Sequence, residues 1–580
     1  MTGDAPGTGA HLVLIETSGN QAYIFATNKR AENVGASELT WRMGTQYALE
    51  AVAETCGSAS LFSRNAGSLR ANLLDKSKNP PIEDGGHAEV IVATSGKALL
   101  LVRTEAQARA IVGRVTRRAL EAAPGIEVRG AVCPVRLGAD SLPKTVLAVH
   151  EAVAGLRAEI PGPSLRFLRL PVVDECASSG LPASHPDLDD PDRQSVISEV
   201  SLKKRNARYD GRDRMRETLT RDQQPPFRLP EDIGETVEWV AVIHADGNGV
   251  GQILQGFGAH IGAGQPGEFR KYIDAMRRFS IALDIVAERA IRGALQEAYE
   301  RQRKRGEGGD VLQAVPLVLG GDDLTLVCDG RIAVRLAADY LAGFEAGTAD
   351  GAICGGILPA VAQSAFGVAR LGACAGVAIV KPHFPFHLAY EMSEALAASA
   401  KAVKRNLRHC GKALPACALD FHTHYDASGA DLGTLRRTHL LVDQGATNLI
   451  GRPYVVTPED QLQDAGFGRE WASAHHWDRL KAARDLFEGQ SDLPPRSQIE
   501  VLRAALFRSY SAAEAELELI RHRYPSIGRI LNTLCGHDAD AADAALFRPE
   551  PWPLAGAPPA DAVKCASGLL DLIDLMDFWR

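Results

Sequence analysis

Residues 315–330, VPLVLGGDDLTLVCDG, form an apolar run that two glycines and two adjacent aspartates interrupt. Two apolar arms, 315–319 and 324–328, on either side of a short glycine-containing segment predict a β-hairpin with a buried body. Asp322 and Asp323 then lie at the tip of that hairpin. Burying carboxylates is costly unless a partner or a metal ion compensates their charge, so the rest of the sequence has to supply one.

The order strand, helix, hairpin, helix, strand occurs twice along the chain, which describes one βαββαβ unit used as an internal repeat. The alternative is a chance match to a common supersecondary pattern. The elements expected in the first copy are a strand from His11 to a turn at 18–20, a helix over 36–54, a strand-turn-strand over 90–102, a helix over 104–123 with Thr104 as N-cap, and a strand over 126–135. Those expected in the second copy are a strand beginning at 237, a long helix, the hairpin, a helix over 331–345, a strand over 373–380 and a helix over 386–405.

Aligning the two copies shows a selective difference at the hairpin tip and at the end of the first strand. Gly96 and Lys97 stand where Asp322 and Asp323 stand, and Thr17 stands where Asp246 stands. By this alignment the first copy keeps the apolar scaffold and lacks all three carboxylates. We therefore expect only the second copy to carry the chemistry that needs them.

A chain of 580 residues is too long for one core, and three to four domains are expected. The fold class predicted is α+β, with two ferredoxin-like βαββαβ domains, the first degenerate and the second active. A basic stretch at 201–222 is interpreted as a solvated connector, with contact to phosphates as the alternative. The expected boundaries are 10–157 for the first βαββαβ domain, 158–236 for a linker or intervening segment, 237–460 for the second βαββαβ domain and 461–580 for a helical C-terminal domain.

Composition restricts the class of protein. A hydrophobic content of 45% and a net charge of −8 are those of an ordinary globular protein, and the acidic balance argues against non-specific coating of nucleic acid, although not against a local groove. The ten cysteines form no C-x-x-C pair, so buried reduced thiols are expected rather than a zinc site. Neither a signal peptide nor an apolar run of about 18 residues is present, so we expect a cytoplasmic protein without membrane contact.

The carboxylates of the second copy predict a metal site. Asp246 ends its first strand, and a βαββαβ unit places that strand end beside the tip of the hairpin. Three neighbouring carboxylates repel one another unless divalent cations bind, and oxygen ligands suit Mg²⁺ or Mn²⁺. We therefore expect a metal-bound nucleoside triphosphate. The glycine-rich turns would let its phosphates approach the backbone, through Gly320 and Gly321 at the hairpin and Gly247, Asn248, Gly249 and Gly251 in the loop after Asp246.

Several segments carry a resemblance to a known family. HADGNGVG (244–251), LVLGGDDLTLVCDG (317–330) and the stretch 375–401 resemble the second palm domain of the large polymerase/cyclase subunit of type III CRISPR effector complexes. They resemble GGDEF diguanylate cyclases and class III adenylyl cyclases more distantly. Residues 16–40 resemble the catalytically silent first palm of the same subunit. CASSGLPA (176–183) is similar to its intervening segment, but only one of the zinc-binding cysteines of many relatives, Cys176, is present.

The resemblance implies a palm fold with two metal ions. Asp246 and Asp322 would be metal ligands, with the Ala245 carbonyl and Asp323 as helpers. Relatives often have a second aspartate where this chain has Asn248. The resemblance also implies that Lys401 and the nearby Arg405 contact triphosphate, with an exposed basic helix face as the alternative. No HD nuclease is expected ahead of the first palm.

The expected activity is the joining of nucleoside triphosphates, ATP first among them, into cyclic or short linear oligonucleotides that act as second messengers in antiviral defence. RNA or other defence-system subunits are possible partners. One alternative is a non-catalytic scaffold subunit that binds nucleotide or RNA, and another is a template-directed polymerase. The histidine pairs in HFPFH (383–387) and FHTH (421–424) are interpreted as packing or hydrogen-bonding groups rather than metal ligands, and GHDADAAD (536–543) as the start of a helix.

Overall fold

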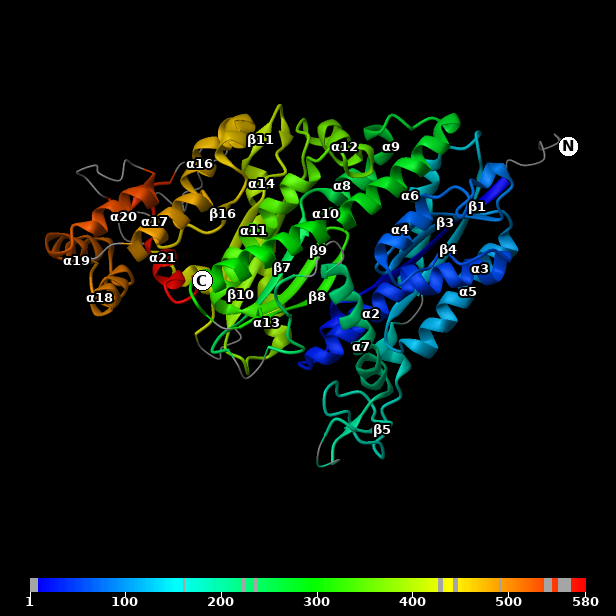
Figure 1. The fold of residues 1–580 in the computed structure, drawn as a ribbon, viewed down its shortest axis with the longest axis horizontal. Coiled ribbons are helices and arrows are strands. Elements are labelled where there is room, and N and C mark those ends of the chain that lie inside the picture. The colour runs from blue at the N-terminus through cyan, green and yellow to red at the C-terminus, as the bar shows by residue number, and fades with distance from the viewer. Residues whose placement is uncertain are drawn as a thin grey trace.

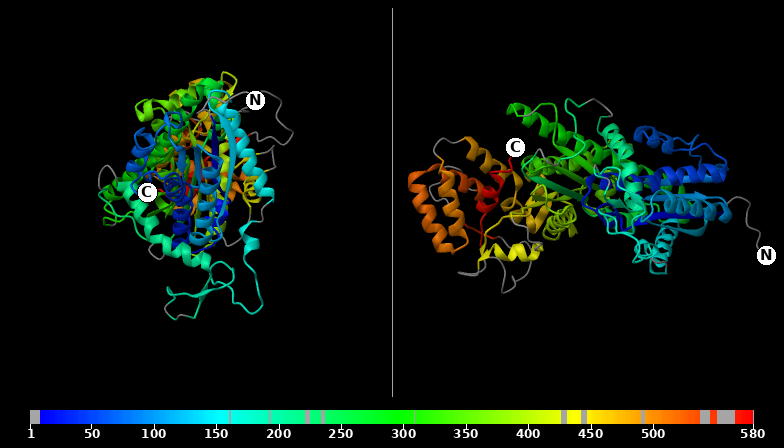
Figure 2. Two further views of the ribbon diagram at one scale, coloured as in Figure 1. Left: turned by 90° about the vertical axis from the view of Figure 1, so that its right-hand side faces the viewer. Right: turned by 90° about the horizontal axis from the view of Figure 1, so that it is seen from below.

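The computed structural model describes residues 9–159, 162–190, 192, 194–220, 225–233, 237–307, 309–425, 431–441, 447–489, 493–536, 545–550 and 565–579. The chain is elongated, with the first half at one end, the second half in the middle and a group of C-terminal helices at the other end (Figures 1 and 2). Both halves combine helices with a central sheet, so the prediction of a mixed α and β protein is confirmed at that level.

The first half is built on a four-stranded antiparallel sheet in the order β2-β3-β1-β4. Its strands are β1 (Gly9–Ser18), β2 (Ala88–Thr94), β3 (Lys97–Val102) and β4 (Glu127–Arg136). Helices α2 (Arg30–Arg42), α3 (Ala48–Cys56) and α5 (Glu105–Ala122) share one core with one face of this sheet, and α6 (Leu142–Glu159) packs on the other face. The predicted N-cap of α5 is confirmed, because the Thr104 side chain accepts a hydrogen bond from the Gln107 amide.

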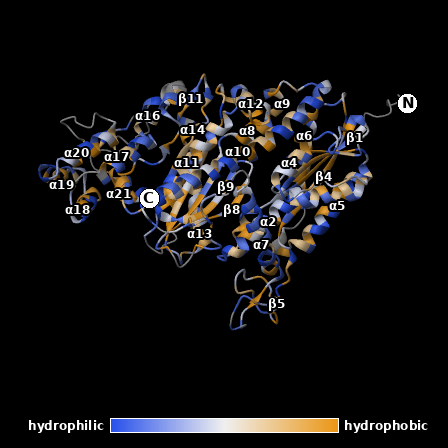
Figure 3. Cartoon of the chain, viewed as in Figure 1, coloured by the Kyte–Doolittle hydropathy of each residue, from blue (hydrophilic) through white to orange (hydrophobic). Residues whose placement is uncertain are grey.

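The second half contains a six-stranded sheet in the order β16-β13-β10-β7-β9-β8. Its strands are β7 (Val240–Gly247), β8 (Ala314–Gly320), β9 (Asp323–Asp329), β10 (Ala373–Val380), β13 (Ala418–Thr423) and β16 (Tyr454–Val455). Helices α10 (Phe269–Lys304) and α11 (Gly330–Thr348) cover one face, and α13 (Phe386–Lys401) covers the other. Apolar residues predominate in these strands, which Figure 3 shows as orange segments near β8 and β9, because helices cover both faces of the sheet.

Within each βαββαβ unit the strands lie in the same order, with the first strand between the fourth and the third. The two halves also pack reciprocally. Helix α10 of the second half lies against β2 of the first, and α2 of the first half lies against β8 of the second. The two hydrophobic cores therefore each contain residues from both halves.

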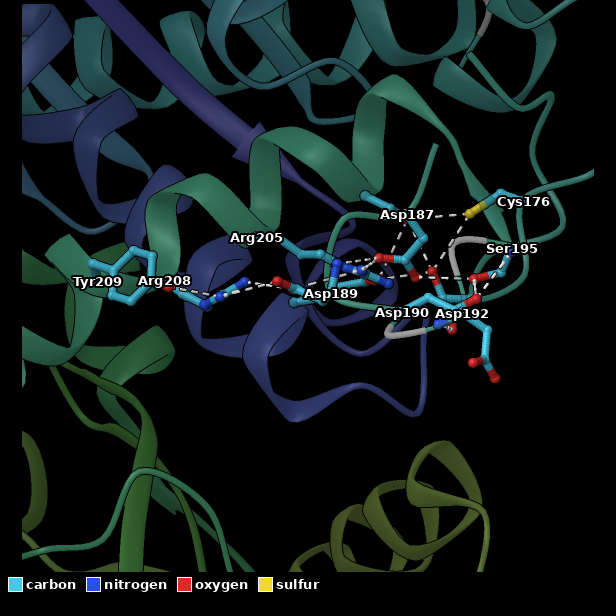
Figure 4. A network of polar contacts seen from close by, with 12 residues as sticks. Cys176, Asp187, Asp189, Asp190, Asp192, Ser195, Arg205, Arg208 and Tyr209 are labelled. Atoms are coloured by element: carbon cyan, nitrogen blue, oxygen red, sulfur yellow. Dashed lines mark hydrogen bonds and ion pairs between the residues drawn. The ribbon is translucent and has the colours of Figure 1, made fainter. Parts of the chain in front are cut away.

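The basic stretch at 201–222 is not a solvated connector, and that interpretation is wrong. It folds into α7 (Glu199–Thr220), which packs along α2. Lys204 is 2% exposed and donates to the Tyr23 carbonyl at 2.5 Å, and Arg205 donates to Glu32 at 2.9 Å. The basic side chains are buried because acidic side chains of α2 and of the loop around Asp187 neutralise them (Figure 4).

The C-terminal region is mainly helical, as predicted, but it does not separate cleanly at 460. Strands β14 (Leu440–Leu441), β15 (Thr447–Asn448), β17 (Arg548–Pro549) and β18 (Cys565–Ala566) form one small sheet across that boundary. Arg452 is buried and pairs with Asp571 at 2.8 Å and Asp574 at 3.2 Å, which ties α21 (Leu569–Leu575) to the segment before 460. The other helices here are α16 (Arg469–Ala474), α17 (Trp477–Gly489), α18 (Arg496–Leu506), α19 (Tyr510–Arg523) and α20 (Ser526–Cys535).

Two histidine motifs behave as packing and hydrogen-bonding groups, as predicted. His387 Nδ1 lies 3.3 Å from Asn28 Oδ1, and His424 packs edge-on against Phe384. Residues 537–543 of GHDADAAD lie outside the described residues. Among the helices that the structure describes, none is both long and apolar enough to cross a membrane. The remaining short elements are α1 (Asn20–Ile24), α4 (Ala66–Leu74), β5 (His185–Pro186), β6 (Val196–Ile197), α8 (Val250–Gln255), α9 (Phe257–His260), α12 (Ile357–Phe366), α14 (Val403–Asn406), β11 (Arg408–His409), β12 (Lys412–Ala413), α15 (Leu432–Thr438), a π-helical turn (Met43–Tyr47) and 3₁₀ segments (Ile82–Asp84, Pro163–Arg166, Pro266–Glu268, Ile353–Gly355 and Glu459–Gly468).

Candidate functional site

The tip of the β8–β9 hairpin lies beside the end of β7. Strand β9 pairs antiparallel with β7 up to Ala245 opposite Leu324, so the next position of this ladder sets Asp246 opposite Asp323. Gly320 pairs with Asp323, which leaves a two-residue turn formed by Gly321 and Asp322. Gly321 has φ +63°, where glycine fits without strain. The three aspartates that the sequence singles out are thus neighbours at one end of the sheet.

Asp322 packs directly against the backbone at the end of β7. A Cβ on Gly247 would lie 2.6 Å from Asp322 Oδ2, so only glycine leaves room for that carboxylate. Burial raises the pKa of Asp322, although the N–H groups of Asp322 and Gly247 donate to the carboxylate and oppose that rise. Burial, followed by the nearby charges of Asp322 and Glu394, raises the pKa of Asp323 to about 7. Both carboxyl groups of the hairpin tip therefore hold their protons more strongly than an exposed aspartate does.

Lys401, the last residue of α13, forms an ion pair with Asp246 Oδ2. The side chains are 29% and 34% exposed, so this part of the site is open to solvent. Burial, and then the charge of Lys404, lowers the pKa of Lys401. His244 lies deeper along the same face of β7, where burial and Lys401 lower its pKa to about 4 and keep its imidazole neutral at pH 7.

The predicted convergence of three carboxylates into one metal cluster is not found. Across the described ranges, no three or more His, Cys, Asp or Glu side chains are gathered so that they could hold a metal ion. Asp246 is ion-paired with Lys401, which compensates part of its charge. The donor chemistry still fits a divalent cation of the Mg²⁺ type, because proteins commonly bind Mg²⁺ through one or two carboxylates while water and substrate phosphates complete its ligands.

Other predicted site residues divide into those free to meet a ligand and those used by the fold. The Asn248 side chain is buried and donates to the Ala416 carbonyl at 2.7 Å and to Cys374 Sγ at 3.0 Å, and its main-chain amide donates to the Gly372 carbonyl at 2.8 Å, so the fold uses both groups. Ala245 is paired on both sides of β7, so the ladder already uses its carbonyl. A Cβ on Gly249 would lie 2.6 Å from Phe366 Cζ, whereas open space surrounds Gly251. The Arg405 side chain lies outside the described residues.

The sequence reasoning missed two acids. Glu394 lies on α13 two turns before Lys401, and its charge acts on Asp323. Asp284 of α10 accepts a hydrogen bond of 2.6 Å from the Gly321 amide at the hairpin tip. The sequence held a signal for Glu394, which falls on the helical stripe of Lys401, whereas Asp284 lies on the α10 face of Arg277 and Glu288, beside the apolar stripe.

The ladder registers correct the alignment of the two halves by one residue. Glu16 pairs with Lys97, the first residue of β3, just as Asp246 comes opposite Asp323, the first residue of β9. Glu16, not Thr17, therefore holds the place of Asp246. The expectation that the first half lacks carboxylates at all three places is wrong at this one, because an alternating strand exposes opposite faces at successive residues.

The first half therefore carries a corresponding site, in which basic side chains surround the strand acid Glu16. Glu16 lies 3.2 Å from Lys97 Nζ, 3.6 Å from Arg157 Nη2 and 4.0 Å from His150 Nδ1. Arg157 and His150 lie seven residues apart on α6, as Lys401 and Glu394 do on α13. Arg129 of β4 pairs across the ladder with Glu16. Lys97 thus stands in the first half where Asp323 stands in the second, and His150, whose pKa burial lowers, stands where Glu394 does.

No family model and no curated protein matches the chain. The solved structures that it resembles include Csm1–Csm4 cassettes in crystal form. With the cassette in complex with AMPPNP the identity is 14% and the TM-score 0.39, over 70% of this chain and 54% of that one. With the cassette in complex with pppApApA the identity is 12% and the TM-score 0.44, over 91% of this chain and 67% of that one. With a Csm1–Csm4 subcomplex of the type III-A CRISPR-Csm interference complex the identity is 12% and the TM-score 0.38, over 70% of this chain and 55% of that one.

The chain therefore spans about half to two thirds of the length of these structures. Likeness at this level does not extend to an activity, so function has to be drawn from the geometry of the site.

Proposed function

We propose that the protein is a palm-domain nucleotidyltransferase that joins nucleoside triphosphates into cyclic or short linear oligonucleotides. The single observation that carries this proposal is the placement of Asp246, Asp322 and Asp323 at one end of the sheet, where the partly exposed Asp246 is paired with Lys401. The strand order of each half supports two ferredoxin-like palm domains over about 10–157 and 237–460, of which the second is the active one.

Asp246 and Asp322 would hold the divalent cations, Mg²⁺ or Mn²⁺, with Asp323 beside them. When bound, two such ions activate a hydroxyl nucleophile and stabilise the leaving pyrophosphate. Gly247, Gly320 and Gly321 keep side chains out of the space next to these acids, and a Cβ at Gly247 would displace Asp322. The protein itself contributes mainly orientation and charge compensation, which is the usual basis of phosphoryl transfer.

Lys401 supplies a cation at the rim of the site. It is ion-paired with Asp246 and partly exposed, and its lowered pKa reflects the neighbouring Lys404. A triphosphate that enters here meets two lysines beside the acids, which favours binding of its negatively charged oxygens. We assign Lys401 to the triphosphate, as the sequence motif implies, and leave Arg405 as a prediction.

The first half would bind the second nucleotide. Its counterpart of the site, with the cations Lys97 and Arg157 and the imidazole of His150 around Glu16, suits a phosphate chain but has too few carboxylates to gather divalent cations. This division assigns binding to one copy and chemistry to the other. We propose ATP as the first substrate to examine and antiviral signalling as the biological setting, with RNA or other defence-system subunits as candidate partners, because the sequence resembles type III CRISPR large subunits.

The test incubates the purified protein with each nucleoside triphosphate and Mg²⁺ or Mn²⁺, with and without RNA, and identifies products by mass spectrometry. Pyrophosphate release with short or cyclic oligonucleotides supports the proposal, provided that Asp322→Ala removes it while the circular dichroism spectrum is retained. RNA-dependent extension would instead identify a template-directed polymerase. Binding of nucleotide or RNA without turnover under every condition would identify a scaffold.

A further inference from the structure

A side chain of α10 accepts a hydrogen bond from the hairpin tip of the second half. Asp284 Oδ1 accepts a hydrogen bond of 2.6 Å from the amide of Gly321, the residue directly before Asp322. In the first half the hairpin turn is held differently, because the Gly96 amide donates to the main-chain carbonyl of Thr40 at 3.0 Å. Only the half with the acids fixes its turn through a carboxylate.

A second acid and a cation from the other half complete this support. Glu288 lies one helical turn after Asp284 on the same face of α10. Arg70 of α4, which belongs to the first half, binds Glu288 through two hydrogen bonds of 2.9 and 2.5 Å. Arg70 and Glu288 are 9% and 7% exposed, so this pair is buried between the halves. The charge of Arg70 also acts on Asp284.

These side chains do not form a ligand site of their own. Together with Ser95 and Gly320 they line a cavity of about 40 Å³ between the two hairpin tips. Ligand pockets commonly measure about 300–1,000 Å³, so this space is too small for a nucleotide. The buried acids and Arg70 therefore serve contacts within the protein.

We propose that Asp284 is a positioning residue for the metal-binding turn and that Arg70, through Glu288 and Asp284, makes this positioning depend on the first half. The inference rests on the proposed nucleotidyltransferase function. Asp284 fixes the Gly321 amide, and the direction of the next residue, Asp322, follows from the conformation of that turn. Misplacement of a reacting group by about 1 Å can reduce a rate about 100-fold.

The variants separate hydrogen bonding from charge. Asp284→Ala removes the acceptor, whereas Asp284→Asn keeps an oxygen that can accept from the Gly321 amide. Arg70→Lys keeps the charge without the paired geometry, and Arg70→Met removes both. Glu300→Gln is the matched control, because Glu300 lies on the same helix and its side chain accepts a hydrogen bond from Gln296 at 2.9 Å.

Two readouts are needed. Steady-state kinetics should show that kcat falls about 10- to 100-fold in Asp284→Ala and in Arg70→Met with KM for the triphosphate changed less than about threefold. Asp284→Asn and Arg70→Lys should recover most of that loss, and Glu300→Gln should match the wild type. Hydrogen–deuterium exchange of a peptide spanning 317–326, without nucleotide, should be faster in Asp284→Ala than in Asp284→Asn or the control.

If hydrogen–deuterium exchange of the 317–326 peptide is the same in Asp284→Ala as in the wild type, the proposal is overturned, whether or not the protein turns over a triphosphate. Faster exchange together with an unchanged kcat overturns the positioning role. A loss of kcat that Asp284→Asn fails to recover, although its exchange matches the wild type, also contradicts it. If the wild-type protein has no turnover with any triphosphate, the nucleotidyltransferase assignment fails, and the exchange measurement alone decides whether Asp284 holds the turn.

Discussion

Lys401 at the end of α13 is ion-paired with Asp246 at the end of β7, and Arg157 at the end of α6 stands in the same relation to Glu16 at the end of β1. The two halves of the chain thus repeat one contact between a helix cation and a strand acid. The surroundings differ, because the hairpin acids lie beside the first contact, whereas Lys97 and the imidazole of His150 lie beside the second.

Replacing Lys401 with glutamine should weaken triphosphate binding. The variant removes a cation at the rim of the site, and a charge-assisted contact to phosphate contributes about 1.5–3 kcal/mol, so we expect KM for the triphosphate to rise about 10- to 100-fold. Steady-state kinetics measures this change. Lys401→Arg keeps the charge and should lose much less. An unchanged KM in Lys401→Gln would show that Lys401 serves Asp246 and not the substrate.

A methyl group at Gly247 should remove activity, whereas one at Gly113 of α5 should not. The added Cβ would lie 2.6 Å from Asp322 Oδ2 in Gly247→Ala and would meet open space in Gly113→Ala. We expect at least a 100-fold loss of kcat in the first variant and wild-type turnover in the second, which is also expected to stabilise α5 slightly because alanine favours helix. Thermal melting followed by circular dichroism reports whether both variants remain folded. Equal activity of the two would contradict the assigned role of Asp322.

Reversing the charge of Lys97 should affect binding of only one of the two nucleotides. Lys97→Glu sets two carboxylates opposite each other on β1 and β3, which is unfavourable and disfavours a phosphate chain. We expect the affinity of the first-half site for the triphosphate to fall about 10-fold or more, while the affinity of the site at Asp322 stays unchanged. Isothermal titration with a non-hydrolysable triphosphate should then report one binding event where the wild type gives two. Two unchanged events would exclude the first half as a nucleotide site.

The Cys176 thiol should make folding depend on pH. Burial raises its pKa, but hydrogen bonds from Ser178, Ser179 and Ser201 outweigh that effect and lower the pKa to about 6 from 9.0 (Figure 4 shows Cys176 beside the network around Asp187). The folded state therefore binds fewer protons between pH 6 and 9, so this contribution to stability is fully present above pH 9 and is lost as the pH falls towards 6.

Urea unfolding of the wild type and of Cys176→Ala across this range measures the contribution. The free-energy difference between them should grow by about 1 kcal/mol or more from pH 6 to pH 9, since one pKa unit corresponds to about 1.4 kcal/mol. Cys133→Ala is the control, because burial raises the pKa of that thiol instead. A difference that stays constant with pH would refute a thiolate at Cys176.

The sequence alone determined the elements and their repetition. The apolar runs on either side of Gly320–Asp323 specified the β8–β9 hairpin, and the helical spacing of apolar residues specified α10, because local periodicity follows directly from side-chain burial. Thr104 signalled the start of α5 for a similarly local reason. The neighbourhood of Asp246 and the hairpin acids also followed, because it needs only the order of strands in a βαββαβ unit.

Only the tertiary structure decided which side chains face the site. Glu16 rather than Thr17 corresponds to Asp246, because strand register is set by the neighbouring strand and a shift of one residue exchanges the two faces. Asn248 turns into the core and Asp284 reaches the hairpin tip through contacts between residues distant in the chain. Helix α7 is buried despite its basic sequence, because the acids that neutralise it come from α2. Pairing of charges across long sequence separations leaves no local pattern that the sequence could reveal.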